Sequence, residues 1–230
     1  MSTRVARRST SWWDSSGLVA VGILGLCALV ALGLALVGWP GSSSDAVTPA
    51  PPGESSVDAG FARDMQTHHN QAVEMSMLVL DRTRDPQVRT LAGDILLTQQ
   101  QQVGQMYGWL ELWALPQTST QPAMSWMNGV HTGSIAMPDG ARMPGMATSV
   151  QLTLLEDSAG RTADRLYLQL LIPHHRGALG MASDAAENAG SPQVRRLAQT
   201  MVDSQTAELK VLHQMLADRG GPLPLVPTAR

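Results

Sequence analysis

Apolar residues recur at the spacing of an α-helix in two stretches of this chain. The first stretch predicts a helix over about residues 57–83 and a second helix that begins at Pro86. Asp85 supports that start, because it places a capping side chain directly before a proline at the first helical position. The apolar faces consist of Phe61, Met65, Ala72, Met75 and Val79, and then of Val88, Leu91, Ile95, Val103, Met106 and Leu110.

The second stretch repeats the first. Residues 61–110 align without a gap with residues 167–216, and twelve of the fifty aligned pairs are identical. Helices are therefore expected over about residues 163–189 and from Pro192 onward. The chain thus contains the same helical hairpin twice.

Two hairpins with apolar faces most simply bury those faces against each other. The predicted fold class is therefore all-α, with a four-helix bundle over residues 57–219 and a tail over residues 220–230. Residues 116–150 connect the two hairpins and are rich in Gly, Pro, Ser and Thr. A connection of this length without structure of its own is uncommon inside a compact domain and is often functional.

An uncharged apolar segment precedes this domain. Residues 17–39 would form a helix of about 34 Å, which is long enough to cross a bilayer. Three arginines precede it, so residues 1–16 are expected to stay in the cytoplasm and the bundle to lie outside. The segment is longer than the apolar region of a cleaved signal peptide, which favours a single-pass anchor in the cell membrane; cleavage would leave a secreted protein. Residues 40–56 predict a flexible linker.

Composition excludes several classes of function. The chain has 16 basic and 19 acidic residues, so it lacks the basic character of a nucleic-acid-binding protein. Its single cysteine, Cys27, excludes an intramolecular disulfide and cysteine-based zinc or iron–sulfur sites. The sequence contains no Glu-x-x-His motif of di-iron bundles, no P-loop and no nucleophile elbow. We therefore expect a binding protein and not an enzyme, with a divergent ferritin-like oxidase as a weaker alternative.

Two adjacent histidines, His68 and His69, follow Met65 on the first predicted helix. Positions i, i+3 and i+4 share one helix face, so the thioether and both imidazoles are expected to converge on one point. Thioether and imidazole ligands together select Cu(I) or its analogue Ag(I) over harder ions such as Mg²⁺. Met75 lies on the His68 face but about 10 Å along the axis, so we expect it to pack in the core or to mark a second ligand position.

The second half repeats the pair as His174 and His175, followed by Met181. Leu171 stands where the first half has the methionine before its histidines, so the second site is expected to contain less sulfur. Pro173 lies within the helical pattern and is expected to kink the helix. Candidates for further ligands on the facing helix are Glu208, His213 and Met215.

The connection between the hairpins carries five methionines. Gly and Pro separate them, so they cannot form one apolar helix face, and a loop that binds soft metal ions explains them better than packing. We single out Met143 and Met146 as sulfur ligands and His131 as a nitrogen ligand.

Each of these features also has an interpretation without metal. A histidine on a helix is more often a hydrogen-bonded or surface residue than a ligand, and a methionine on an apolar helix face usually packs. Two pairs at matching places in both halves favour a metal or proton role. The alternative is a structural or interaction module of the cell envelope, with another envelope protein or a second copy of the chain as partner.

The pattern Met-x-x-His-His-x-x-Ala-x-x-Met at residues 65–75, followed by Pro-x-Val-Arg-x-Leu-Ala at residues 86–92, resembles the domain-of-unknown-function 305 family. So does Met-Pro-Gly-Met at residues 143–146, and the likeness covers about residues 58–218. It implies a ferritin-like helical bundle and an exported or membrane-anchored location; some relatives are copper-binding or copper-tolerance proteins. It also implies ligand roles for His68, His69, His174, His175, Met65, Met75 and Met181.

Together these observations predict a membrane-anchored, extracytoplasmic bundle that binds Cu(I) or Ag(I) through histidine and methionine. Such a protein would buffer the metal or pass it on. Its expected partners are the metal ion and the membrane, and not nucleic acid.

Overall fold

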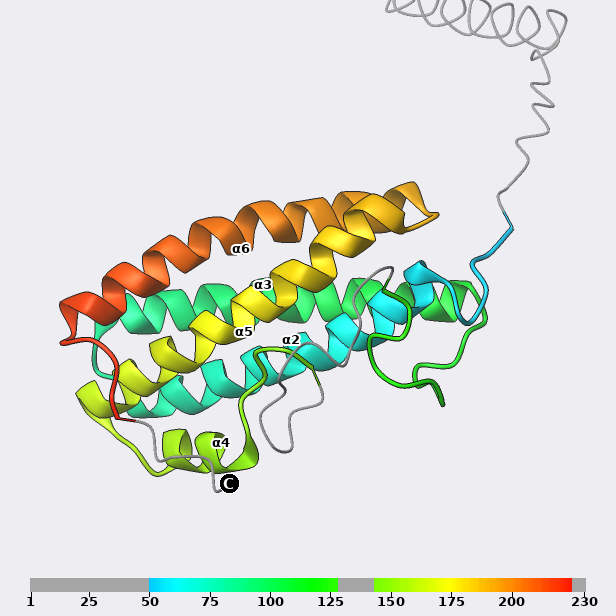
Figure 1. Cartoon of the computed structure of the whole chain (residues 1–230). Helices are drawn as coiled ribbons and strands as arrows, with labels where there is room; N and C mark the ends of the chain where they lie inside the picture. Colours follow the sequence, from blue (N-terminus) through cyan, green and yellow to red (C-terminus); the bar gives the residue numbers. More distant parts are fainter. Residues whose placement is uncertain (1–49, 128–142, 225–230) are drawn as a thin grey trace, which may run out of the picture. The chain divides into compact units, whose positions relative to one another are not determined.

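The computed structural model describes residues 50–127 and 143–224, and this part of the chain is all-helical (Figure 1). The predicted anchor and most of the linker lie outside the described residues. None of the helices in the described part is long and apolar enough to span a bilayer. The described helices are α2 (Val57–Arg82), α3 (Pro86–Leu112), α4 (Ser149–Glu156), α5 (Gly160–Asn188) and α6 (Pro192–Asp218).

The all-α prediction is confirmed, and the four long helices form the two predicted hairpins. The second helix of each hairpin begins where its capping residue predicts. The Asp85 carboxylate accepts hydrogen bonds from the backbone N–H groups of Gln87 and Val88 at 2.9 and 3.3 Å. Ser191 caps α6 in the same way. Helix α5 begins earlier than expected, at Gly160, and continues through Pro173 as one element.

The two hairpins pack on each other through their first helices, α2 and α5. Helices α3 and α6 pack mainly on the first helix of their own hairpin. Phe61 on α2 and Tyr167 on α5 are fully buried, and burial of one such side chain contributes about 2 kcal/mol or more to folding. The Tyr167 hydroxyl pairs with the Ser76 hydroxyl at 2.8 Å, which satisfies both polar groups within the α2–α5 interface.

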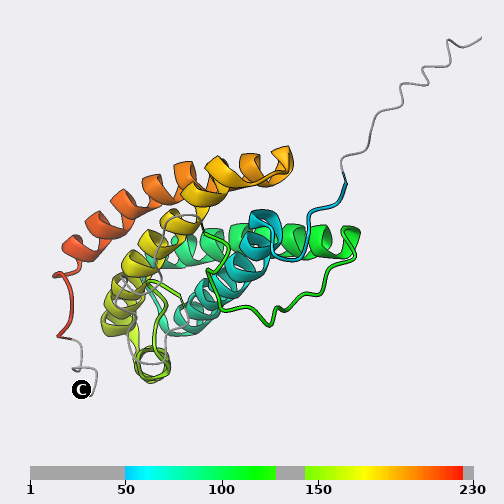
Figure 2. The same cartoon turned by 45° about the vertical axis from the view of Figure 1, so that its right-hand side comes forward.

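A short helix that the hydrophobic pattern did not predict, α4, ends the connection between the hairpins. Thr148 and Gln151 form a reciprocal capping box at its start. Leu155 is its fully buried residue and belongs to the apolar cluster around Tyr167. Figure 2 shows α4 nearly end-on beside α2 and α5, on the side away from α6. The connection is therefore part of the packed domain at this end.

Residues 143–147, which we call the strap, lie against both α2 and α5 just before α4. The Gln71 side chain on α2 donates to the Ala147 carbonyl at 2.9 Å and accepts from the Ala147 N–H at 2.7 Å. Gly145 lies against the backbone of Pro173, and its φ of 77° suits a residue without a Cβ. Gly177 on α5 lies against the Pro144 carbonyl. Glycines on both sides thus allow the strap to approach the helix backbone closely.

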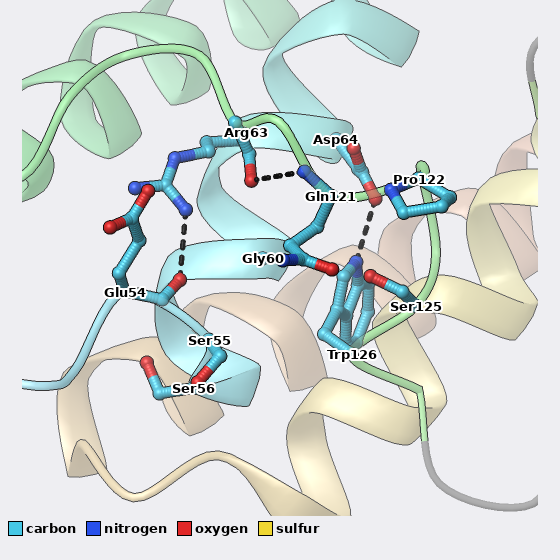
Figure 3. Close-up of a pocket in the computed structure, with 11 residues that line it drawn as sticks. Glu54, Ser55, Ser56, Gly60, Arg63, Asp64, Gln121, Pro122, Ser125 and Trp126 are labelled. Carbon is cyan, nitrogen blue, oxygen red and sulfur yellow. Dashed lines mark hydrogen bonds between the residues drawn. The ribbon is translucent and has the colours of Figure 1, made fainter.

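The start of the connection is fastened to the first turns of α2. The Asp64 carboxylate accepts from the Met124 N–H at 2.6 Å and from the Trp126 indole N–H at 2.7 Å (Figure 3). The Trp126 ring lies directly over Gly60, where a Cβ would collide with it. Arg63 donates to the backbone carbonyls of Pro116 and Glu54, both at 2.9 Å. These contacts hold both the end of the linker and the start of the connection on α2.

Substitution of the glycines at the contact between the strap and α5 tests the docked position of the strap. Gly145→Ala and Gly177→Ala are each expected to lower the free energy of unfolding by about 2 kcal/mol, because the new Cβ collides with backbone atoms of the facing segment. Gly104→Ala on α3 is the matched control, since a Cβ there meets nothing within 4 Å and should stabilise the helix by up to about 1 kcal/mol. Chemical denaturation of the purified chain measures all three. Wild-type stability of Gly177→Ala would contradict the docked position of the strap.

Candidate metal centre

The two histidine pairs lie where α2 and α5 meet. The side chains of His68, His69 and His175 are fully buried, and His174 is 1% exposed. The pairs stand 106 residues apart in the sequence, and the duplication brings them into one interface. Buried imidazoles need hydrogen-bond partners, because a polar group moved out of water without one costs folding free energy.

The two members of each pair face in different directions, because adjacent residues on a helix are about 100° apart. The inner members, His68 and His174, contact each other across the interface, with ring centroids 3.9 Å apart and an interplanar angle of 41°. The outer members face the second helix of their own hairpin. His69 reaches Gln102 on α3 and His175 reaches Glu208 on α6, each 33 residues farther along the chain.

All four rings use Nε2 for their hydrogen bonds. His68 Nε2 lies 3.1 Å from the Pro144 carbonyl oxygen of the strap, and His174 Nε2 lies 3.0 Å from the His68 carbonyl oxygen. A carbonyl oxygen only accepts, so Nε2 of both inner rings carries the proton. The outer rings meet acceptors as well, with Gln102 Oε1 at 2.8 Å from His69 and a Glu208 carboxylate oxygen at 2.7 Å from His175.

The other ring nitrogen, Nδ1, is buried and has no hydrogen-bond partner among the described residues in any of the four rings. Burial lowers the pKa of His68 to about 4. It lowers the pKa of His69 to about 3, and that of His174 falls well below its usual value for the same reason. These rings are neutral at pH 7, so each directs an unshared electron pair from Nδ1 into the interior. That is the chemical state of a histidine that binds a metal ion.

Many of the buried methionines lie in one apolar cluster. Met65 on α2 and Met181 on α5 are fully buried in one apolar cluster, and the strap residue Met143 belongs to it too. The other methionines of this cluster are Met106, Met124 and Met201, with the partly buried Met127 and Met146 packed against it. This apolar cluster thus combines buried thioethers from both hairpins and from the connection between them.

The fold places the predicted methionine ligands in two different apolar clusters. Met75 is fully buried in the second apolar cluster, together with Met215, and not with Met65 and Met181. His131 lies outside the described residues. His68 turns toward α5 and the strap, whereas His69 turns toward α3. Their convergence with Met65 on one ion stays a prediction. Within residues 50–127 and 143–224, no group of three or more His, Cys, Asp or Glu side chains is arranged to hold a metal ion.

Sequence reasoning missed the amide partner of His69, Gln102, and named Glu208 only as one of several candidates. A signal existed, since these two residues occupy equivalent positions in the duplication and each lies 33 residues after its histidine. Gln99 and Gln205 are a second equivalent pair. Both are 4% exposed, and their side-chain oxygens have no partner among the described residues.

A separate cavity of about 150 Å³ opens between the first turns of α2, the end of the linker and the start of the connection (Figure 3). Arg63, Asp64 and Trp126 line it together with serine and glutamine side chains, and none of the paired histidines does. The histidine cluster is thus distinct from this cavity.

Duplicated helical hairpins that bury two histidine pairs between them define the class of helical bundle to which this chain belongs. Residues 58–216 match the model of the family described as Domain of unknown function (DUF305). The chain belongs to this family.

The solved structures agree with that membership. A DUF305 protein from Streptomyces coelicolor is 45% identical, with a TM-score of 0.67 over 76% of this chain and 100% of that one. CopM, solved in a Cu(II)-bound form, is 26% identical, with a TM-score of 0.51 over 71% of this chain and 97% of that one.

An uncharacterized protein of Acanthamoeba polyphaga mimivirus is similar in sequence over a short stretch, with 37% identity over 49 residues, which are 21% of this chain. The match spans 32% of that viral relative.

The lowered histidine pKa values predict how the metal-free protein responds to pH. Unfolded histidines take up a proton near pH 6.5, but His68 and His69 do so in the folded state only near pH 4 and pH 3. The unfolded state therefore binds more protons, and stability is full above about pH 6.5 and falls as the pH drops through 5 toward 4. Each such histidine should cost about 2 kcal/mol between pH 7 and pH 5.

Urea denaturation of the metal-free chain at the two pH values measures this loss. His213→Gln is the control, because His213 lies exposed on α6 and its replacement should leave the difference unchanged. Equal stability at pH 7 and pH 5 would mean that the paired rings are protonated within the fold.

Proposed function

We propose that this chain binds soft metal ions, Cu(I) and Ag(I), outside the cytoplasm and buffers them or passes them on. The observation that carries the proposal is the arrangement of the four buried imidazoles. Each has Nε2–H held by an oxygen acceptor and Nδ1 without a partner in the described part of the chain. Metal-binding histidines commonly donate their second N–H to a carbonyl or carboxylate in this way, which fixes the ring and its tautomer.

The choice of metal follows from the donor atoms. Neutral imidazole nitrogens suit copper, and thioethers suit its monovalent state and Ag(I). Met65, one helical turn before His68, and Met143, next to the strap residue Pro144 that contacts His68, provide thioethers, and Met181 lies in the same apolar cluster. A site with these donors would discriminate strongly against Mg²⁺ and Ca²⁺, which take oxygen ligands. Binding and release explain this arrangement without any catalytic step.

The relatives support a copper ion and an extracytoplasmic location. CopM, which shares the fold, has been solved with Cu(II) bound. The Streptomyces coelicolor relative is assigned to the secreted proteins. For this chain, the uncharged segment at residues 17–39 supports an anchor in the membrane that would hold the bundle on the outer side.

One observation favours the alternative of a structural or interaction module of the envelope. The described residues lack a group of three His, Cys, Asp or Glu side chains suited to a metal ion. In this alternative the histidines serve only as buried, hydrogen-bonded core residues. The two functions differ in what metal does to stability, because a ligand that binds only the folded state raises its free energy of unfolding.

Metal binding is tested on the full-length chain in detergent. Ag(I) at one hundred times its dissociation constant should add about 2.7 kcal/mol to the free energy of unfolding, whereas Mg²⁺ should add nothing. The variant with His68→Gln and His174→Gln removes both inner Nδ1 atoms and should lower the Ag(I) affinity at least about tenfold. His213→Gln is the control, because His213 is exposed and contacts Arg176 and the Leu209 carbonyl and not the paired histidines.

An NMR measurement that resolves the two ring nitrogens is made on the wild-type protein, so it does not depend on whether the variants fold. Ag(I) added to wild-type protein should shift the Nδ1 resonances of the paired histidines far more than their Nε2 resonances. If neither the thermal stability nor the histidine resonances change on addition of Ag(I) or Cu(I), the result favours the structural module.

A further inference from the structure

The outer histidines of the two halves have the same geometry but different partners. His69 donates to a neutral amide, Gln102, which is 5% exposed. His175 donates at 2.7 Å to a carboxylate, that of Glu208, whose side chain is 30% exposed. The duplication makes these positions equivalent, so the chain holds one outer histidine with a neutral partner and one with an anionic partner.

An anionic partner changes what the ring can bind. A carboxylate that accepts the N–H of a ligating imidazole increases the electron density on the other nitrogen and makes it a stronger donor. It also adds a negative charge close to the bound ion, and this charge attracts a divalent cation twice as strongly as a monovalent one. Because the Glu208 carboxylate is partly exposed, it keeps part of its hydration and its charge is less costly than that of a fully buried group.

The residue one helical turn before each histidine pair also differs between the halves. Met65 precedes the first pair by one helical turn and is fully buried, whereas Leu171, also fully buried, stands at the equivalent position before the second pair. A thioether favours Cu(I) and Ag(I), and its loss makes a site relatively better for Cu(II). Both differences therefore favour the monovalent ion in the first half and the divalent ion in the second.

We infer that the two halves have diverged in metal preference, and that Glu208 makes the second histidine pair the stronger binder of Cu(II). The first pair, with Gln102 and Met65, is selective for Cu(I) and Ag(I). The inference rests on the proposed function, because it assigns different ions to the two halves of the same histidine cluster. Glu208 acts through His175, so it is a positioning residue that sets specificity and not itself a ligand.

The duplication provides the experiment. Glu208→Gln gives the second half the partner of the first, and Gln102→Glu gives the first half the partner of the second. We expect Glu208→Gln to lower the Cu(II) affinity about 10- to 100-fold and the Ag(I) affinity less than about threefold. Gln102→Glu should raise the Cu(II) affinity of the folded protein. Glu187→Gln removes an equal charge from an exposed position on α5 and should change neither affinity.

The affinities are measured on the full-length chain by competition with chelators, Cu(II) and Ag(I) being added separately, and the Cu(II) electron paramagnetic resonance spectrum is recorded for each variant. The spectrum of wild type and that of Glu208→Gln should differ, because the donor strength of one nitrogen changes. Equal losses for both ions, or unchanged Cu(II) affinity in Glu208→Gln, would overturn the inference while leaving metal binding intact. Wild-type protein that binds neither ion would instead overturn the proposed function.

Discussion

The hydrogen bonds of four buried imidazoles are the constraint on which this fold depends. Each ring needs an acceptor, and each finds it on a different element: the strap, α2, α3 and α6. Removal of one acceptor would leave a buried N–H unsatisfied, at a cost of about 1–3 kcal/mol. The imidazoles thus fix the distance between α2 and α5 and the position of both second helices, and they make the strap part of the interface.

The strap also breaks the symmetry of the duplication. His174 Nε2 bonds to the carbonyl of His68, but His68 Nε2 bonds to the strap residue Pro144 and not to the carbonyl of His174. The close approach that makes this possible needs Gly145 and Gly177, and the first half has Gln71 at the position equivalent to Gly177. The insertion between the hairpins therefore gives the two halves different surroundings, which is the condition under which two copies can acquire different properties.

Local chemistry explains what could be predicted from the sequence. The starts of α3 and α6 follow from a capping side chain before a proline, and the hairpins follow from apolar periodicity, so both were found. Helix α4 is short, and its signal was the capping pair Thr148 and Gln151, which lies in a connection that composition marks as loop. In the site, the acceptors of His68 and His174 are backbone carbonyls, which leave no mark in the sequence. The side-chain partners of the outer histidines do have a sequence signal, because Gln102 and Glu208 lie at the same spacing after His69 and His175.

The two interpretations of the histidines, as structural residues and as ligands, are compatible because each ring has two nitrogens. The Nε2–H groups connect the helices through their hydrogen bonds, and Nδ1 has no hydrogen-bond partner among the described residues. A protein that buffers a metal must stay folded both empty and loaded, so its ligands cannot depend on the ion for their positions. A zinc finger differs in this respect, because it folds only when its metal ion is bound. Here the partners of Nε2 fix each ring in advance, so a metal ion bound as proposed would lose less free energy to the ordering of its ligands.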